Sequence, residues 1–315
     1  MTRELDVIVA GELYVDMIMS GFEFWPQPGR EAFAKEYRRE IGGGASITAC
    51  GLAKIGSRAA VLGLVGGDFA DWIADRLKHC GVDVSLLHMD AVEATGFTVV
   101  ATTPEDRAFL TYAGANRAFP EALMEAASSK QLSIARHVHL GFAPDIETAE
   151  TLFDRIHECG CTISLDVGWH PEWLQDPRAL AALKKVDLFF PNEIEAHAMT
   201  GEEQPGKALR KFADTGIERV ALKLGSRGAM LLSQGELWTV ATHKVTAVDT
   251  TGAGDCFDAG FLHAWLKGEQ PGMCLLTANM CGAISTEGYG GISAFPTPER
   301  LHHELSKGSS CTKRP

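Results

Sequence analysis

The stretch Asp249-Thr250-Thr251-Gly252-Ala253-Gly254-Asp255-Cys256-Phe257 carries the strongest structural signal in this sequence. Its two glycines flank a small alanine and lead directly into a helix-length segment, residues 253–266. Glycines at such a junction let backbone N–H groups converge at a helix N-terminus, which favours the binding of an anion. An aspartate in the first turn can take a proton from an attacking hydroxyl, or it can simply cap the helix. The stretch alone is compatible with both a catalytic site and an ordinary helix entry.

Outward from this stretch, short apolar runs alternate with helix-length segments. The first run, residues 5–11, is continuously apolar apart from one aspartate and ends in glycine, as is typical of a buried parallel strand. Similar runs recur at residues 59–64, 137–140, 162–165, 188–190 and 219–222, with helix-length segments at 46–55, 70–79, 146–158 and 193–199. The alternation predicts an α/β fold with a central, mainly parallel sheet covered by helices, and we expect residues 1–315 to form one domain.

Two segments, residues 14–40 and 95–112, break the alternation. The first holds turn signals and aromatic residues, and the second has two β-rich arms around Pro104-Glu105-Asp106. We expect antiparallel strands here that form a small β flap over one end of the domain. The residues after Leu305 are expected to fray.

Composition restricts the class of partner. Of the 315 residues, 41 are Asp or Glu and 29 are Lys or Arg, a formal net charge of −12. Such a charge repels nucleic acid and anionic lipid, and no basic patch offsets it. No apolar run is long enough to span a bilayer, and the first residues lack the apolar core of a secretion signal. We therefore expect a cytoplasmic protein with no nucleic-acid or membrane partner, and we interpret its eight cysteines as reduced thiols.

Together with four other segments, the 249–257 stretch resembles the C-terminal signature of the ribokinase-like (PfkB-type) carbohydrate kinases. The other segments follow in the family's order: Gly42-Gly43-Gly44 leading into residues 52–56, Gly66-Gly67-Asp68, Pro191-Asn192-Glu193-Ile194-Glu195, and Lys223-Leu224-Gly225-Ser226-Arg227-Gly228. The resemblance covers roughly residues 4–305. It implies a ribokinase-like three-layer α/β/α domain with a small β-sheet lid. It also implies transfer of the γ-phosphoryl of ATP to a hydroxymethyl group of a sugar or sugar derivative.

The resemblance implies roles for individual residues on the phosphoryl side. Asp255 would be the general base, and Gly252, Ala253 and Gly254 would form the anion hole. Asn192 and Glu195 would organise Mg²⁺ through water, although a helix cap and a first-turn acid are the structural alternative. Lys223, Gly225 and Gly228 would line the nucleotide site, and Asn279 would border the adenine. Asp249 and Thr251, with residues 285–293, resemble a monovalent-cation loop, which suggests a possible dependence on K⁺.

The acceptor is less well defined. The resemblance places Asp16, Gly42, Gly43, Gly44, Tyr14 and Ile47 at the sugar-like small-molecule substrate. Tyr14 and Ile47 replace asparagines of the ribose-specific pattern and Gly141 replaces a glutamate, so ribose fits poorly. The segment 166–170 also lacks the arginine of the sugar-acid branch. A phosphorylated acceptor, a nucleoside kinase and a non-catalytic ligand sensor stay open as alternatives. Because exposed flap edges invite pairing, we expect a homodimer formed through the lid.

Overall fold

A central sheet organises the chain in the computed structural model, which describes residues 3–25, 27–103, 107–307 and 311–314. Within these residues the sheet has ten strands in the order β14-β13-β12-β11-β10-β9-β8-β1-β4-β5. The strands are β1 (Leu5–Ala10), β4 (Ala59–Gly66), β5 (Leu87–Asp90), β8 (Ala135–Leu140), β9 (Thr162–Leu165), β10 (Leu188–Phe189), β11 (Arg219–Lys223), β12 (Ala229–Ser233), β13 (Glu236–Val240) and β14 (Cys311–Arg314). The pairs from β5 through β11 are parallel, and the pairs from β11 to β14 are antiparallel.

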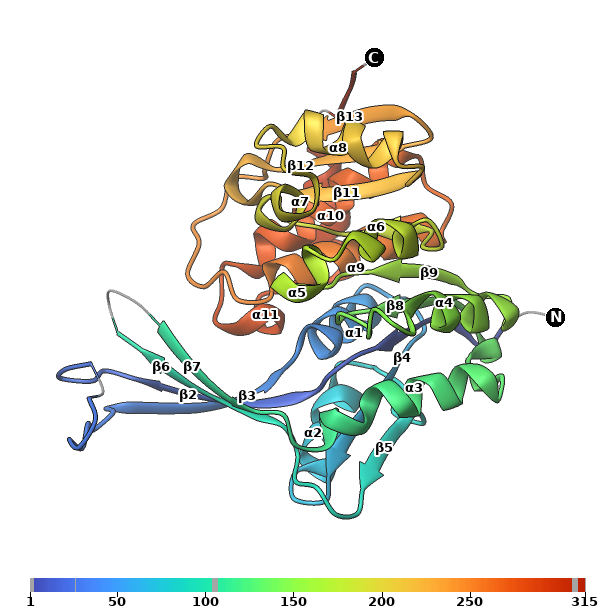
Figure 1. Cartoon of the computed structure of the whole chain (residues 1–315). Coiled ribbons are helices and arrows are strands. Elements are labelled where there is room, and N and C mark those ends of the chain that lie inside the picture. Colours follow the sequence, from blue (N-terminus) through green and yellow to red (C-terminus); the bar gives the residue numbers. More distant parts are fainter. Residues whose placement is uncertain (1–2, 26, 104–106, 308–310, 315) are drawn as a thin grey trace.

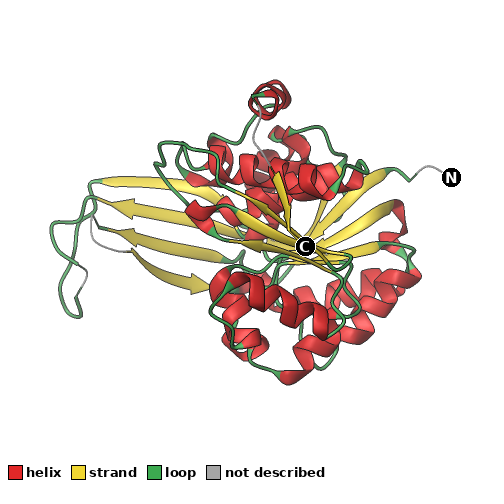
Figure 2. Cartoon of the chain, turned by 90° about the horizontal axis from the view of Figure 1, so that it is seen from above, coloured by secondary structure: helices red, strands yellow, loops and turns green. Residues whose placement is uncertain are grey.

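Helices cover both faces of this sheet (Figures 1 and 2). One face carries α3 (Phe119–Ser128), α4 (Ala149–Glu158), α5 (Pro171–Leu174), α6 (Pro177–Leu183), α7 (Glu193–Thr200) and α8 (Pro205–Asp214). The other carries α1 (Gly44–Lys54), α2 (Ala70–His79), α9 (Ala253–Leu266), α10 (Pro271–Ser285) and α12 (Pro298–Ser306). The short α11 (Gly290–Ser293) packs against α1 and α9. Alternate residues of β1 supply both cores, with Ile8 on the first side and Val9 on the second. The three-layer α/β/α expectation is confirmed.

Four further strands form a separate sheet, here called the lid, which projects from the body (Figures 1 and 2). They are β2 (Tyr14–Ser20), β3 (Glu36–Gly42), β6 (Phe97–Thr102) and β7 (Arg107–Tyr112), in the order β3-β2-β6-β7. The expectation of antiparallel pairing holds for β2–β3 and β6–β7, whereas β2 and β6 pair in parallel. Both of these strands leave the body in the same direction, because each follows the end of a body strand. The expected turn at Pro104-Glu105-Asp106 lies outside the described residues.

Hydrogen bonds anchor the lid to the end of β4. Asp68, which follows β4, accepts from the backbone N–H (2.9 Å) and the hydroxyl (2.7 Å) of Thr95. The Thr95 hydroxyl oxygen in turn accepts from the N–H of Gly66 at 2.9 Å. Residues 66–68 thus fix the point where the second lid segment leaves the body.

The expectation that the chain frays after Leu305 is wrong for residues 311–314. This segment is β14, an antiparallel edge strand on β13. Its Lys313 ammonium lies 5.5 Å from the ring centroid of Trp238, and its Cys311 packs against the second core. Contacts with β13 and the second core offset the low strand propensity of this polar segment. A local sequence pattern does not reveal such long-range contacts.

No helix in the described parts of the chain is both long and apolar enough to cross a membrane.

The packing of α1 on α9 yields a stability prediction. A methyl group on Gly51 of α1 would lie 2.8 Å from the Ala259 Cβ and 3.0 Å from the Phe295 ring. A methyl group on Gly206 of α8 would find only the Met230 Cε, at 3.9 Å. Both changes gain helix propensity, but Gly51→Ala overpacks the core. In urea denaturation, we expect the free energy of unfolding of Gly51→Ala to be about 1–3 kcal/mol lower than that of Gly206→Ala. Equal stabilities would contradict the close approach of the two helices.

Candidate active site

The site is built around the N-terminus of α9. Gly252 is the residue preceding this helix, and its φ of 72° is a left-handed conformation that glycine adopts without strain. Its carbonyl accepts the first helical hydrogen bond, from the N–H of Cys256 at 2.9 Å. The first N–H groups of an α-helix have no partner within the helix itself. Of those at the start of α9, the Ala253 N–H donates to the Thr250 carbonyl at 3.2 Å. Residues 252–254 therefore present donors and the positive end of the helix dipole at one point.

The N-terminus of α1 meets the N-terminus of α9 at Asp255. A Cβ atom on Gly44, the first residue of α1, would lie only 2.5 Å from the Asp255 Oδ1. The Thr48 hydroxyl donates to the Asp255 carbonyl at 3.3 Å. A Cβ on Gly252 would lie 2.7 Å from the Ile47 Cδ1, so Ile47 packs against the glycine loop. The two helix starts hold the Asp255 carboxylate between them.

Asp255 combines partial exposure with an unusual proton affinity. Removal of the carboxylate from bulk water, reinforced by the negative charge of Asp166, raises the pKa of Asp255 to about 7. The nearby Lys223 ammonium limits this rise. A carboxylate with a pKa near neutrality accepts a proton far more readily than a solvated one.

A second carboxylate, Asp16 on β2, lies on the other side of the triple glycine. A Cβ on Gly42 would lie 2.2 Å from the Asp16 Oδ1, so only glycine leaves room for the carboxylate. Asp16 pairs with Glu40 across the β2–β3 ladder. Burial, followed by the charge of Glu40, raises the pKa of Asp16 to about 6.

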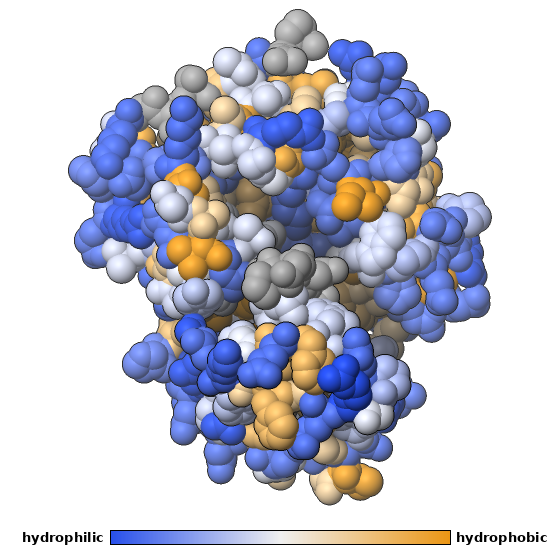
Figure 3. Space-filling model, turned by 90° about the vertical axis from the view of Figure 1, so that its left-hand side faces the viewer, coloured by the Kyte–Doolittle hydropathy of each residue, from blue (hydrophilic) through white to orange (hydrophobic). Residues whose placement is uncertain are grey.

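Asp16 lines a cavity of about 270 Å³ beneath the lid. The lid strands contribute Asp16, Ile18, Ser20, Glu36, Arg38, Glu40, Val100, Thr102 and Phe109, and the body contributes Val248, Asp249, Thr251, Tyr289 and Gly290. Figure 3 views the molecule toward the lid and shows this face hollowed between lid and body. Tyr14 and Ile47 do not line this cavity. The Tyr14 hydroxyl instead donates to the Glu12 carboxylate at 2.6 Å.

Asp249 joins two loops at the mouth of this cavity. Its Oδ1 accepts from the N–H (3.0 Å) and the hydroxyl (2.8 Å) of Thr251, and its Oδ2 accepts from the N–H of Gly290 at 3.0 Å. The structure therefore brings the 249–251 and 285–293 segments together, as the resemblance implied.

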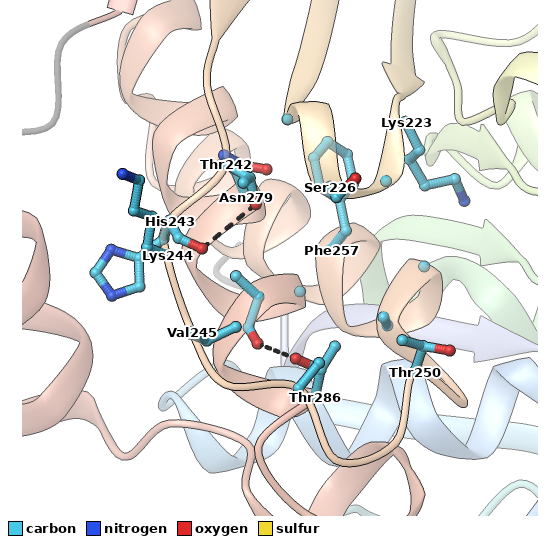
Figure 4. Close-up of a pocket in the computed structure, with 17 residues that line it drawn as sticks. Lys223, Ser226, Thr242, His243, Lys244, Val245, Thr250, Phe257, Asn279 and Thr286 are labelled. Atoms are coloured by element: carbon cyan, nitrogen blue, oxygen red, sulfur yellow. Dashed lines mark hydrogen bonds between the residues drawn. The ribbon is translucent and has the colours of Figure 1, made fainter.

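A larger cavity, of about 630 Å³, lies on the other side of α9 (Figure 4). Lys223, Gly225, Gly228 and Asn279 all line it, together with Gly254 and the 242–247 loop. Asn279 on α10 donates to the Ala241 carbonyl at 2.6 Å. Thr286, whose hydroxyl donates to the Ala283 carbonyl, closes the lower end in Figure 4. The four residues predicted at the nucleotide thus surround one cavity that borders the glycine loop.

Asn192 and Glu195 form a capping box at the start of α7. The Asn192 Oδ1 accepts from the Glu195 N–H at 3.0 Å, and the Glu195 Oε2 accepts from the Asn192 N–H at 2.8 Å. Glu195 is nevertheless buried, and burial raises the pKa of its carboxyl, with Asp166 adding to the effect. Because both of its oxygens already accept hydrogen bonds, including one from the Asn192 amide, the pair fits a hydrated divalent cation better than direct ligation.

The sequence analysis did not identify Asp258 as a site residue. It considered Asp166 only as part of the 166–170 segment and not as a partner of Lys223. Lys223, at the end of β11, donates to the Asp166 Oδ2 at 2.6 Å and lies 3.4 Å from both oxygens of Asp258. Asp258 stands three residues after Asp255, a spacing that puts both on one face of a helix. That spacing was the available signal.

Known proteins resemble the chain over most of its length. The profile of the pfkB family carbohydrate kinases matches residues 5–298. The 2-dehydro-3-deoxygluconokinase of Bacillus subtilis (strain 168) is 30% identical over 288 residues, covering 86% of this chain and 88% of that protein. The ATP-dependent ribose-1-phosphate kinase of Halopiger xanaduensis is 31% identical over 305 residues, covering 96% and 98%.

The architecture agrees with these matches. The structure of Arabidopsis thaliana ribokinase complexed with ribose and ATP superimposes with a TM-score of 0.86 at 27% identity, covering 97% of this chain and 99% of that one. The family profile, the relatives and the fold all indicate the same family. The chain belongs to the pfkB family of carbohydrate kinases and is a phosphotransferase.

Proposed function

We propose that the protein transfers the γ-phosphoryl of ATP to a hydroxymethyl group of an uncharged sugar or sugar derivative, with Asp255 as general base. One observation carries the proposal. The Asp255 carboxylate, with a pKa raised to about 7, lies at the N-terminus of α9 and against Gly44. Just before it in the chain, Thr251 lines the lid cavity and Gly254 lines the nucleotide cavity.

The chemistry follows from this placement. Asp255 accepts the proton of the acceptor hydroxyl as its oxygen attacks the γ-phosphorus in line. The N–H groups of Gly252, Ala253 and Gly254 donate to the phosphoryl oxygens, where negative charge must be stabilised. The lid excludes water from the cavity that Asp16 lines, which limits wasteful hydrolysis.

The nucleotide fits the larger cavity. Its volume of about 630 Å³ is in the range of small-molecule sites, and its inner end is the glycine loop that would receive the phosphates. The Arabidopsis ribokinase of the same fold is described in complex with ATP, which supports the same nucleotide here. A Cβ atom on Gly282 of α10 would lie 3.0 Å from the Ala253 carbonyl oxygen. Asn279, one helical turn earlier, also lines the cavity and lies farther from the loop, in keeping with a place beside the adenine.

Mg²⁺ completes the site in this proposal. Asn192 and Glu195 would hold it through water, as the hydrogen-bonded state of their side chains favours. When bound, it would neutralise charge on the phosphoryl oxygens. The Asp249–Thr251–Gly290 junction is the place where a K⁺ requirement would arise.

The lid cavity favours an acceptor without negative charge. Among the residues that the structure describes, four carboxylates line it, those of Asp16, Glu36, Glu40 and Asp249, against the single guanidinium of Arg38. The Arg38 guanidinium lies over the Tyr289 ring, 4.5 Å from its centroid, and 3.9 Å from Glu36. A phosphate or carboxylate on the acceptor would meet net repulsion, whereas carboxylates accept hydrogen bonds from sugar hydroxyls.

Two alternatives remain distinguishable. A nucleoside kinase is favoured by the exposed rings of Phe109 and Tyr289, which line the same cavity and could stack on a base. A non-catalytic sensor would bind ATP and ligand without turnover. In either case we expect the protein in the cytoplasm, where ATP is available.

The first prediction of the proposed function concerns the acceptor and the base. ADP release is measured with Mg²⁺-ATP over free sugars, polyols, sugar phosphates, sugar acids and nucleosides, with and without K⁺. We expect turnover with an uncharged sugar or polyol, and a fall in kcat of about 10²–10⁴ in Asp255→Asn, because proton transfer is lost while ATP still binds. Near-normal turnover in this variant would refute the base, and turnover only with nucleosides would favour the alternative.

The second prediction is a pH dependence. Asp255 acts as a base only when it is ionised, so kcat/KM should fall below an apparent pKa near 7, about tenfold per pH unit. Asp16, with a pKa of about 6, is the other carboxylate whose protonation would lower kcat/KM at acidic pH. Asp16→Asn should therefore leave the midpoint near 7. If the midpoint shifts in Asp16→Asn, the fall of kcat/KM at low pH reports Asp16 and not Asp255.

The third prediction is a homodimer formed through the lid. Leu110 and Tyr37 are 68% and 58% exposed on the lid face opposite to the one that lines the cavity. A second copy would cover this apolar face and protect the edge strands β3 and β7. By light scattering we expect twice 33.9 kDa for the wild type and 33.9 kDa for Leu110→Glu. A monomeric wild type would disprove it.

A further inference from the structure

A lysine lies buried among carboxylates beside the glycine loop. The side chains of Lys223 and Asp166 are each only 13% exposed, and that of Asp258 is fully buried. Lys223 ends β11 and Asp166 follows β9, so both lie at the carboxyl edge of the parallel sheet, where α/β proteins bind ligands. The Asp166 Oδ2 accepts from Lys223 at 2.6 Å and its Oδ1 from the Gly168 N–H at 3.0 Å.

The Lys223 ammonium lies next to the glycine loop. A methyl group placed on Gly254 would lie 3.5 Å from the Lys223 Nζ, so the ammonium adjoins the loop that is proposed to receive the phosphoryl. Lys223 also lines the large cavity together with Gly254 (Figure 4). The other lysine among the described residues that line this cavity, Lys244, belongs with His243 to the 242–247 loop on its far wall in Figure 4.

Burial and neighbouring charges shift the pKa values of Lys223, Asp166 and Asp258. Burial lowers the pKa of the Lys223 ammonium, but Asp166 and Asp258 outweigh this effect and raise it above its ordinary value. Burial, with the charge of Asp166 and against the opposing charge of Lys223, raises the pKa of Asp258 well above its ordinary value. The Lys223 ammonium thus lies between two buried acids, 2.6 Å from the Asp166 Oδ2 and 3.4 Å from both oxygens of Asp258.

We propose that Lys223 is a catalytic residue whose ammonium contacts the transferring phosphoryl, and that Asp166 and Asp258 are positioning residues that hold it beside Gly254. This inference rests on the proposed phosphoryl transfer. Asp255, Asp166 and Glu195 leave the site rich in negative charge, and Lys223 is the cation within reach of the glycine loop. An ammonium fixed there before the reaction stabilises charge without reorganisation.

The step balances without a further reactant. The acceptor oxygen forms a bond to the γ-phosphorus and gives its proton to Asp255. The bond from that phosphorus to the bridging oxygen breaks, and its electron pair leaves on ADP. Lys223 keeps its three protons throughout, in keeping with its raised pKa.

The direct test is Lys223→Met, which keeps chain length and removes the charge. We expect kcat to fall about 100-fold while the KM for ATP changes less than about threefold, because the contact strengthens in the transition state. Lys185→Met is the matched control, since it removes a surface ammonium paired with Asp154 and should change neither constant. A kcat within threefold of wild type, or a loss confined to KM, would overturn the catalytic role.

The positioning role is tested at Asp258. An asparagine keeps the size of Asp258 and a polar group beside Lys223 and Asp166, so Asp258→Asn should keep kcat within about threefold. Asp258→Leu has similar volume but no polar group, and we expect a loss of at least tenfold in kcat at an unchanged KM for ATP. Equal activity of the two variants would refute the positioning role, and thermal unfolding of each separates this effect from misfolding.

A binding measurement separates failure of this inference from failure of the proposed function. ADP, Mg²⁺ and fluoroaluminate together mimic the phosphoryl in flight and need no known acceptor. By calorimetry we expect Lys223→Met to weaken this complex at least tenfold while ADP alone binds within threefold of wild type. Unchanged fluoroaluminate binding would overturn the inference even if the wild type is an active kinase. If Lys223→Met weakens the fluoroaluminate complex but the wild type turns over no acceptor, the role of Lys223 is supported and the proposed function is refuted.

Discussion

The site depends on a run of backbone that carries no side chains. Gly42, Gly43 and Gly44 pass between two carboxylates, and a Cβ atom on the first or the last would overlap Asp16 or Asp255. Gly43 has a φ of 88°, and a Cβ there would collide with the Glu12 carbonyl. The same three residues connect β3 of the lid to α1 of the body, so they join the lid to the helix that contacts Asp255.

Charge is then arranged around this backbone. The N-termini of α1 and α9 meet at Asp255, which gives the site positive helix ends and converging N–H donors. Buried acids oppose them: burial, followed by the charge of Asp166, raises the pKa values of Asp255 and Glu195. Lys223 relieves part of this repulsion through Asp166. A site so balanced can bind an anion tightly and still keep a carboxylate basic enough to accept a proton.

The capping box on α7 illustrates how a local motif serves two purposes. Asn192 and Glu195 satisfy each other's hydrogen bonds, as the cap interpretation expects, yet Glu195 is buried at the edge of the charged cluster. Similarly, Asp68 is part of a glycine-rich motif in the sequence, and the structure shows that it fastens the lid through Thr95. In both cases the motif residues connect elements that the sequence alone shows only as separate segments.

By itself, the sequence determined the α/β class, the two lid segments, the glycine loops and the family, because periodicity, glycine placement and motif order are local or linear properties. Only the tertiary structure decided which groups meet. It turned the Tyr14 hydroxyl to Glu12, paired β2 with β6 in parallel, and added β14 to the sheet edge. It also placed Asp258 and Asp166 around Lys223, from three elements distant in the chain. Burial and charge coupling arise from such long-range contacts, and no spacing of residues along the chain encodes them directly.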